Sequence, residues 1–256
     1  MSGSSFWTNS VSPRSLRLHE RRSPIDSRMK FAQAPIALPQ RRIVHVALKV
    51  WQSAAASHAA GGRELEDSLT EVLARLAHLA EYRDDKTGQH AKRVGLVASG
   101  IARDLGLSDD QVELIRWAAP LHDIGKIAIP DHILRKPGAL TPEEFDIIKT
   151  HTTIGAKILA EGHSQVLRMA AEIALTHHER WDGTRYPGQV RGDAIPLSGR
   201  VVAVADAFEA MLGLRTFRKG RPIEQAVDEI KRCAGTQFDP RVVEAFLTRS
   251  SFPHSP

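Results

Sequence analysis

The chain has 256 residues, 42% of them apolar, which is enough for one large domain or two small ones around a buried core. It contains a single cysteine, Cys233, so an internal disulfide framework is excluded and a reducing compartment is expected. The sequence has neither a run of about 18 apolar residues nor a secretory signal pattern, and we therefore expect a cytoplasmic protein without a transmembrane segment.

The net charge of +5 is distributed unevenly along the chain. Residues 1–60 contain 9 lysines and arginines against 2 acidic residues, whereas the remaining residues contain 26 against 28. A basic arm of this kind can bind nucleic acid or an anionic surface, but a solvated tail has the same composition. No aromatic residues alternate with the cations as they do where bases stack, so no specific nucleic acid partner is expected.

The N-terminal part, residues 1–62, is expected to be a basic and poorly ordered segment. Most of it is rich in Ser, Pro and Arg without a sustained hydrophobic period, although residues 43–57 are apolar enough for a short helix. A Gly-Gly pair then interrupts the chain. Residues 63–250 have a helical pattern almost throughout and are predicted to form one domain.

Helical periodicity begins at residues 64–82, where leucine and valine recur at three- and four-residue steps and mark one apolar face. The same pattern predicts a second helix over residues 90–107. Ser108 followed by two aspartates then indicates a capped helix start, with acidic groups where the helix dipole favours them.

A further helix start is predicted at Thr141. Threonine as the N-cap, Pro142 in the first turn and Glu144 three residues after the cap form the pattern of a capping box. More helices are expected over residues 166–178, 197–212, 222–234 and 240–247. No segment alternates as a β-strand does, so the predicted fold class is all-α.

Histidine carries most of the chemical information in this sequence. Five of the twelve histidines and two aspartates lie in contexts that indicate metal ligands: His90, His122, Asp123, His151, His177, His178 and Asp206. Imidazole and carboxylate together suit Fe, Mn, Zn or Co, and two-metal sites commonly share a bridging carboxylate.

The adjacent residues His122 and Asp123 cannot face the same side of a regular helix. They can diverge around a helix end, and Gly125 lies just beyond them. Such a turn would let Asp123 lie between two ions while His122 binds one of them. Asp206 follows an apolar run, where a carboxylate is costly unless it is paired or bound to metal.

Each of these residues has a simpler explanation when it is considered alone. A buried histidine is more often hydrogen-bonded in the core than a ligand, Asp206 could cap a neighbouring helix, and His177 with His178 could be a surface pair. The joint pattern favours a metal site, because all seven residues would otherwise need separate explanations. The remaining histidines are given no functional role: His19, His45, His58, His78, His132, His163 and His254.

Six long stretches extend this pattern: EYRDDKTGQHAKRVG (81–95), AAPLHDIGKIAIPDHILRKPGALTPEE (118–144), HTTIGAKIL (151–159), IALTHHERWDGTRYPG (173–188), IPLSGRVVAVADAFEAM (195–211) and GTQFDPRVVEAF (235–246). They resemble the HD-GYP subgroup of the HD-domain phosphohydrolases, and most closely the output domains of two-component response regulators. The resemblance implies an HD-domain helical bundle with the C-terminal helical extension of that subgroup. It also implies hydrolysis of the bacterial second messenger cyclic di-GMP to pGpG or GMP.

The same resemblance implies roles for individual residues. It makes the seven residues named above metal ligands, makes Asp123 and Lys126 catalytic, and places substrate contacts at Lys126, Tyr186, Arg215 and Arg218. Two cations can generate a hydroxide near neutral pH and stabilise charge on phosphoryl oxygens, while basic side chains hold the phosphates. Arg215 and Arg218 also fit a solvated basic run, and that alternative stays open.

Position 86 departs from the pattern of the family. Many members have a glutamate there that binds a third metal, whereas this chain has Lys86. An ammonium group has no lone pair to offer a cation, so the sequence predicts two divalent ions, with Fe or Mn as the expected metals.

The Gly-Tyr-Pro motif that names the subgroup reads Arg-Tyr-Pro at residues 185–187. If φ is positive at Arg185, the arginine strains the loop by about 1 kcal/mol; if φ is negative, it is tolerated or adds a phosphate contact. Thr216 and Phe217 stand where the family often has Pro-Tyr, and Glu209 where it often has aspartate. These changes put substrate affinity more in question than metal binding.

A receiver domain needs roughly a hundred residues or more, which residues 1–60 cannot supply. We therefore expect regulation by another protein, or the loss of an N-terminal domain. The helix over residues 64–82 would then be a former linker, and such linkers often mediate homodimers.

Three functions remain open from the sequence. The first is a two-metal phosphodiesterase acting on cyclic di-GMP. The second is a binding module for cyclic di-GMP or for a diguanylate cyclase, with weak or no turnover because of Arg185. The third is a phosphohydrolase of nucleoside phosphates, against which the loop containing Tyr186 and the paired histidines 177 and 178 argue.

Overall fold

The protein is described by a computed structural model that covers residues 62–82, 89–213 and 220–248, and for residues 62–70 the backbone alone. The basic segment before Gly62, with the helix expected over residues 43–57, lies outside the described residues.

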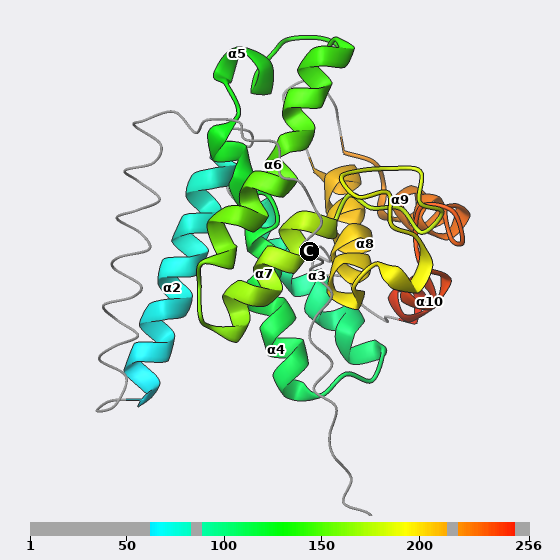
Figure 1. Cartoon of the computed structure of the whole chain (residues 1–256). Coiled ribbons are helices and arrows are strands. Elements are labelled where there is room, and N and C mark those ends of the chain that lie inside the picture. Colours follow the sequence, from blue (N-terminus) through cyan, green and yellow to red (C-terminus); the bar gives the residue numbers. More distant parts are fainter. Residues whose placement is uncertain (1–61, 83–88, 214–219, 249–256) are drawn as a thin grey trace, which may run out of the picture. The chain divides into compact units, whose positions relative to one another are not determined.

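The described residues form α-helices and short 3₁₀ helices, joined by loops (Figure 1). The α-helices are α2 (Gly62–Glu81), α3 (His90–Asp104), α4 (Asp109–Ala118), α5 (Asp131–Leu134), α6 (Pro142–Ala160), α7 (Gln165–Thr176), α8 (Leu197–Leu212), α9 (Ile223–Arg232) and α10 (Pro240–Leu247). The 3₁₀ helices are η1 (Ala119–Leu121), η2 (Ile124–Ala128) and η3 (Gly192–Ala194). Extended pairing within the described ranges is limited to one isolated bridge. The expected all-α fold class is confirmed, and none of the helices described is both long and apolar enough to cross a membrane.

Two helix starts follow the capping patterns in the sequence. The side chains of Ser108 and Thr141 accept hydrogen bonds from the backbone N–H groups of Gln111 and Glu144. The side chains of Gln111 and Glu144 accept in return from the backbone N–H groups of the two capping residues. Each capping box satisfies donors that have no partner inside the helix.

The observed helix ends lie within three residues of those predicted from the sequence. Helices α8 and α10 begin and end where expected. Helix α3 ends at Asp104 instead of residue 107, because Gly106 adopts a φ of 78° that the helix cannot continue through. Helix α5 and the three 3₁₀ helices were not predicted, since segments this short have no hydrophobic period to detect.

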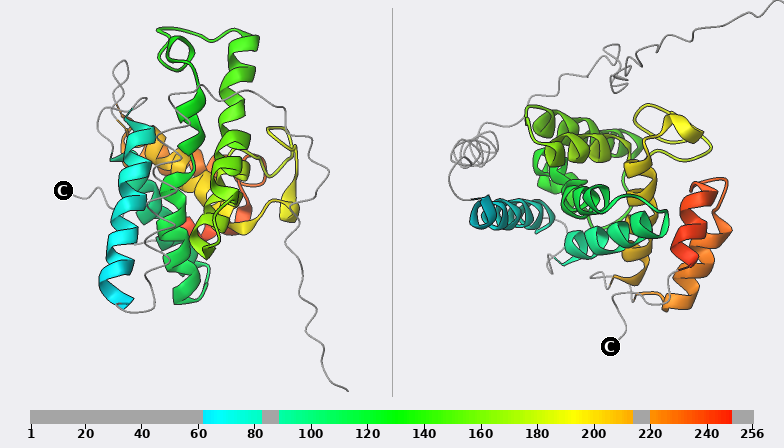
Figure 2. Two further views of the ribbon diagram at one scale, coloured as in Figure 1. Left: turned by 60° about the vertical axis from the view of Figure 1, so that its left-hand side comes forward. Right: turned by 90° about the horizontal axis from the view of Figure 1, so that it is seen from below.

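Helix α3 lies at the centre of the core. It packs against α4, α8 and α10, and its Val94, Val97 and Ile101 side chains are fully buried. Helix α2 packs against η2 and α3, whereas α9 and α10 pack against α8 at the opposite side of the bundle (Figure 2). Removing this apolar surface from water is the main force that fixes the helices around α3.

The close contact between η2 and α6 requires a glycine. A Cβ atom at Gly125 would lie 1.9 Å from the carbonyl oxygen of His151 and 2.6 Å from the backbone nitrogen of Gly155. Backbone atoms cannot move aside as the end of a flexible side chain can, so only a residue without a side chain allows this approach. The approach brings Asp123, which immediately precedes η2, toward His151.

We predict that Gly125→Ala destabilises the fold, because the added methyl group forces η2 away from α6. Overpacking of this kind typically costs about 1–3 kcal/mol in the free energy of unfolding, which urea denaturation measures. Gly213→Ala is the matched control, since the nearest atom to a Cβ there is 3.3 Å away. Equal stability of both variants would contradict the packing argument.

Candidate metal centre

The seven residues that the sequence indicated as ligands lie together in two clusters. Within each cluster, one ligand atom from every residue lies within 4.8 Å of the others. The first cluster contains Asp123, His151, His177 and His178, and the second contains His90, His122 and Asp206. The residues come from α3, α6, α8 and the turns that follow η1 and α7.

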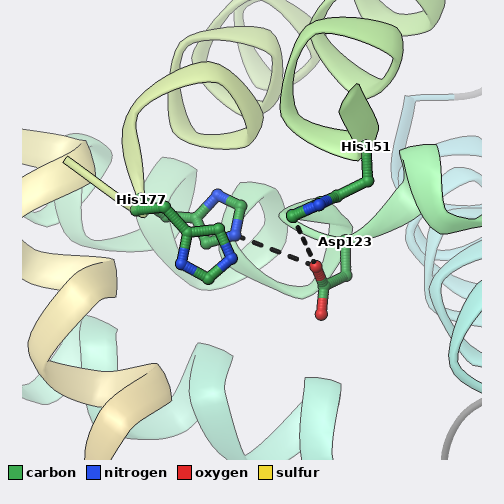
Figure 3. A group of neighbouring side chains, drawn as sticks. Asp123, His151 and His177 are labelled. Carbon is green, nitrogen blue, oxygen red and sulfur yellow. Dashed lines mark ion pairs between the residues drawn. The ribbon is translucent and has the colours of Figure 1, made fainter. Parts of the chain in front are cut away.

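His122 and Asp123 occupy the turn between η1 and η2. His122 caps η1, and Asp123 leaves the helical conformation with φ −102° and ψ 10°. As a result, Asp123 Oδ2 lies 3.2 Å from His122 Nε2. Asp123 Oδ1 lies 3.3 Å from His151 Nε2 and 3.8 Å from His177 Nε2 (Figure 3). The Asp123 carboxylate therefore lies between the two clusters.

Three of the imidazole rings are held from behind by the backbone. The Nδ1 atoms of His122, His151 and His177 lie 2.9, 2.7 and 3.1 Å from the carbonyl oxygen of a residue three or four positions earlier. Nδ1 therefore carries a proton and donates it, so that Nε2 holds the lone pair whenever the ring is neutral. This arrangement is typical of histidines that bind metal through Nε2.

Several polar atoms that face the inside of the clusters have no hydrogen-bond partner among the described residues. Nε2 of His122, His151 and His177 and Oδ1 of Asp123 are buried without a hydrogen-bond partner among the residues described. A buried polar group in this condition costs roughly 1–3 kcal/mol. A divalent cation would satisfy these atoms, and nitrogen with carboxylate oxygen is a suitable donor set for a transition metal. The residues present therefore fit a metal site.

The histidines of the first cluster are uncharged near neutral pH. Burial lowers the pKa of His178 to about 4 and holds the pKa of His177 well below its usual value, with the neighbouring imidazoles adding to the effect. Burial also lowers the pKa of His151. Neutral imidazole is the form that binds a cation, so these ligands need not lose a proton first.

The carboxylates, in contrast, remain ionised. Burial alone would raise the pKa of Asp123, but the positive charges of Lys126 and His122 outweigh it and hold this pKa well below its usual value. The pKa of Asp206 is also lowered, because His90 and His122 outweigh the effect of burial. Burial lowers the pKa of His122, yet Asp123 and Asp206 raise it to about 9. Two negatively charged carboxylates thus lie close to the histidines in a largely buried place.

Two parallel polar contacts join α3 to α8. His90 Nε2 lies 3.0 Å from Asp206 Oδ1, and one helical turn further Arg93 Nε donates to Glu209 Oε2 at 2.7 Å. Glu209 is fully buried. Because both contacts join residues with the same offset along the two helices, the Arg93–Glu209 pair fixes the register that places His90 opposite Asp206.

Sequence reasoning missed the structural role of Glu209. The argument applied to Asp206 could have identified it, because burying an acidic side chain in an apolar helical run costs free energy unless that side chain has a partner. The partner, Arg93, could not be identified, because it lies 116 residues away in the sequence.

Tyr186 lies on the loop that follows the paired histidines. Its ring centroid is 5.0 Å from that of His178, and burial raises the pKa of its phenol to about 12. Glu179 joins the two ends of this loop, since its Oε1 accepts a hydrogen bond of 2.6 Å from the backbone N–H of Gly188. Burial raises the pKa of Glu179 to about 7.

The strain considered for Arg185 is absent. Among the non-glycine residues that the structure describes, only Gln189 has a positive φ. The second alternative therefore holds: the backbone at position 185 accepts arginine without strain. The Arg185 guanidinium lies 6.0 Å from the centroid of the Tyr186 ring.

Of the remaining residues predicted to belong to the site, the structure describes Lys126 but not five others. Lys126 lies at the centre, with Nζ 2.7 Å from Asp123 Oδ2. Five further positions lie outside the described residues, so the expectations for them stay predictions: Lys86, Arg215, Thr216, Phe217 and Arg218.

Comparison with known proteins places this site in context. The profile of the HD domain family matches residues 74–242. The chain is 54% identical over 184 residues to a cyclic di-GMP phosphodiesterase of Thermotoga maritima, covering 72% of this chain and 50% of that protein. It is 45% identical to the cyclic di-GMP phosphodiesterase response regulator RpfG of Xanthomonas campestris, covering 72% of this chain and 49% of that one. The chain thus matches about half the length of these two relatives.

Two other proteins extend the comparison. The 3'3'-cGAMP-specific phosphodiesterase 2 of Vibrio cholerae is 40% identical, over 72% of this chain and 35% of that protein. The fold is similar to that of Bd1817, an HDG"Y"P protein of Bdellovibrio bacteriovorus, with a TM-score of 0.51, 19% identity, and coverage of 86% of this chain and 73% of that one.

We predict that metal stabilises the fold by satisfying the buried donor atoms. At a free metal concentration a hundred times the Kd, the free energy of unfolding should rise by about 2.7 kcal/mol, and chelation should reverse the gain. Thermal unfolding with and without Mn²⁺ measures the effect. His177→Ala should reduce the shift, and an unchanged melting temperature in the unaltered protein would contradict the assignment.

We also predict that Glu209→Gln lowers the metal content of the purified protein, because the Arg93 contact weakens and the register of α3 against α8 loosens. Glu209→Asp keeps the carboxylate and should retain most of the metal. The control is Glu229→Gln, which breaks the exposed pair with Arg232. Elemental analysis should show a loss in Glu209→Gln alone, and equal metal in all variants would show that the pair has no positioning role.

Proposed function

We propose that this chain, which belongs to the HD-domain family and to its HD-GYP subgroup, is a metal-dependent phosphodiesterase that hydrolyses cyclic di-GMP to pGpG or GMP. The observation that supports this most is the Asp123 carboxylate between two groups of imidazoles, because the Nε2 atoms of three of them have no hydrogen-bond partner among the described residues. The names of two relatives at 54% and 45% identity point to the same substrate.

The proposal includes two divalent cations, with Fe or Mn as the expected metals. His90, His122 and Asp206 would hold one, and the cluster around His151 would hold the other, with Asp123 shared between them. Bound there, the cations would lower the pKa of coordinated water and neutralise charge on phosphoryl oxygens. The count of two rests on Lys86, which offers no lone pair for a third.

The chain's own side chains would bind and orient the substrate. The Lys126 ammonium lies beside Asp123 and can hold a phosphoryl oxygen at the cluster. The Tyr186 phenol keeps its proton near neutral pH, since its pKa is about 12, and can donate it in a hydrogen bond to the substrate. Arg215 and Arg218 are proposed to contact phosphate from outside the described residues.

Residues 63–250 form the proposed catalytic domain, and residues 1–62 a separate basic segment. We propose a cytoplasmic location because the substrate is a second messenger. Regulation would come from a separate protein, a diguanylate cyclase or a second copy of the chain.

A binding module without turnover is the weaker alternative. Its motive was the altered motif at Arg185, and the backbone there is unstrained. A second substrate, 3'3'-cGAMP, is favoured by one observation, the name of the relative at 40% identity. The two substrates share the phosphodiester chemistry and differ in one base.

We predict that anaerobically prepared protein loaded with Fe or Mn converts cyclic di-GMP to pGpG or GMP, and that Asp123→Asn abolishes the conversion. An amide lacks the negative charge with which the Asp123 carboxylate would hold the cations. Asp228→Asn, an exposed aspartate on α9, is the control and should react as the unaltered protein does. Chromatography of the products measures this; no product from the loaded, unaltered protein would overturn the proposal.

A further inference from the structure

Beside the first cluster, three aromatic rings follow one another outward. The ring centroids of His178 and Tyr186 are 5.0 Å apart, and those of Tyr186 and Phe145 are 6.1 Å apart at an interplanar angle of 89°. Tyr186 belongs to the loop after α7 and Phe145 to the first turn of α6. The rings therefore lead from the metal ligands to the surface.

Phe145 is one of the few large apolar side chains of the described residues that remain exposed, with 39% of its surface accessible. An exposed aromatic ring next to a nucleotide-binding centre offers a face on which a base can stack, and stacking of this kind tolerates any base. Phe145 alone would thus hold a purine without identifying it.

Arg185 supplies a group that can identify the base. Other arginines near this loop have carboxylate partners: Arg180 pairs with Asp182, and Arg200 with Asp239. Within the described ranges Arg185 makes no ion pair, is exposed, and lies 6.0 Å from the Tyr186 ring centroid. Its guanidinium is therefore available beside the aromatic rings.

We propose that Phe145, Tyr186 and Arg185 form a purine subsite in which Arg185 selects guanine over adenine. This inference rests on the proposed function and defines which base the same site takes beside the scissile phosphate. Guanine presents two acceptors, O6 and N7, that match the paired donors of a guanidinium. Adenine presents a donor at N6 in place of O6, so one contact is lost and two donors face each other.

This assignment gives a role to the departure of position 185 from glycine. A glycine has no side chain to reach the base edge, whereas arginine reaches it without backbone strain. The subsite therefore predicts a stronger guanine preference in this chain than in a variant without the guanidinium.

The test compares kcat/KM for cyclic di-GMP with kcat/KM for cyclic di-AMP in the metal-loaded protein. Arg185→Gln should lower this ratio about tenfold or more, because glutamine loses the guanine contact and matches the N6 and N7 edge of adenine. Arg191→Gln is the matched control: Arg191 is an exposed arginine of the same loop and should leave the ratio unchanged.

Phe145→Leu tests the stacking face separately. It keeps an apolar side chain and removes the ring, so kcat/KM should fall about tenfold for both dinucleotides while their ratio stays constant. An unchanged ratio in Arg185→Gln, or an equal change in Arg191→Gln, would overturn the role of Arg185. Unchanged kcat/KM in Phe145→Leu would overturn the stacking face.

Failure of the subsite can be distinguished from failure of the proposed function. If the unaltered protein hydrolyses neither dinucleotide, the proposed function fails, and the ratio of the two Kd values, measured by calorimetry for the same variants, tests the subsite instead. If the unaltered protein is active and the ratio does not respond to Arg185→Gln, the subsite alone fails.

Discussion

The largely buried carboxylate of Asp123 is the constraint on which the rest of the site depends. Its two oxygens face different groups of imidazoles, and Lys126 contributes a positive charge beside them. Negative charge in a buried place is costly unless cations surround it. His151, His177 and His178 are uncharged near neutral pH, so a divalent ion bound there would add positive charge to that of Lys126 and His122.

The backbone positions Asp123 through contacts distant from the chemistry. The 3₁₀ turns on both sides of Asp123 place its carboxylate beside His122 Nε2, and Gly125 allows η2 to approach α6. The backbone carbonyls behind the histidines aim Nε2 inward. Rigid helices thus carry the ligands, while the substrate-facing groups lie on the loop around Tyr186, where change costs less stability.

The features that could be predicted from the sequence are those determined by interactions between residues close together in the chain. The capping boxes at Ser108 and Thr141 and the apolar period of α8 depend on neighbouring residues, so they could be predicted from the sequence. The grouping of the seven ligand candidates followed from residue type together with the family resemblance. The Arg93–Glu209 pair, the approach of Phe145 to Tyr186 and the sign of φ at Arg185 could not be predicted, because each depends on how distant helices and loops pack.

The most direct test of the two-cluster centre is anomalous X-ray diffraction from crystals of the Mn²⁺-loaded protein, recorded on both sides of the manganese absorption edge. The account predicts two peaks on either side of the Asp123 carboxylate, one beside His151, His177 and His178 and the other beside His90, His122 and Asp206. A single peak, or peaks away from these residues, would contradict it.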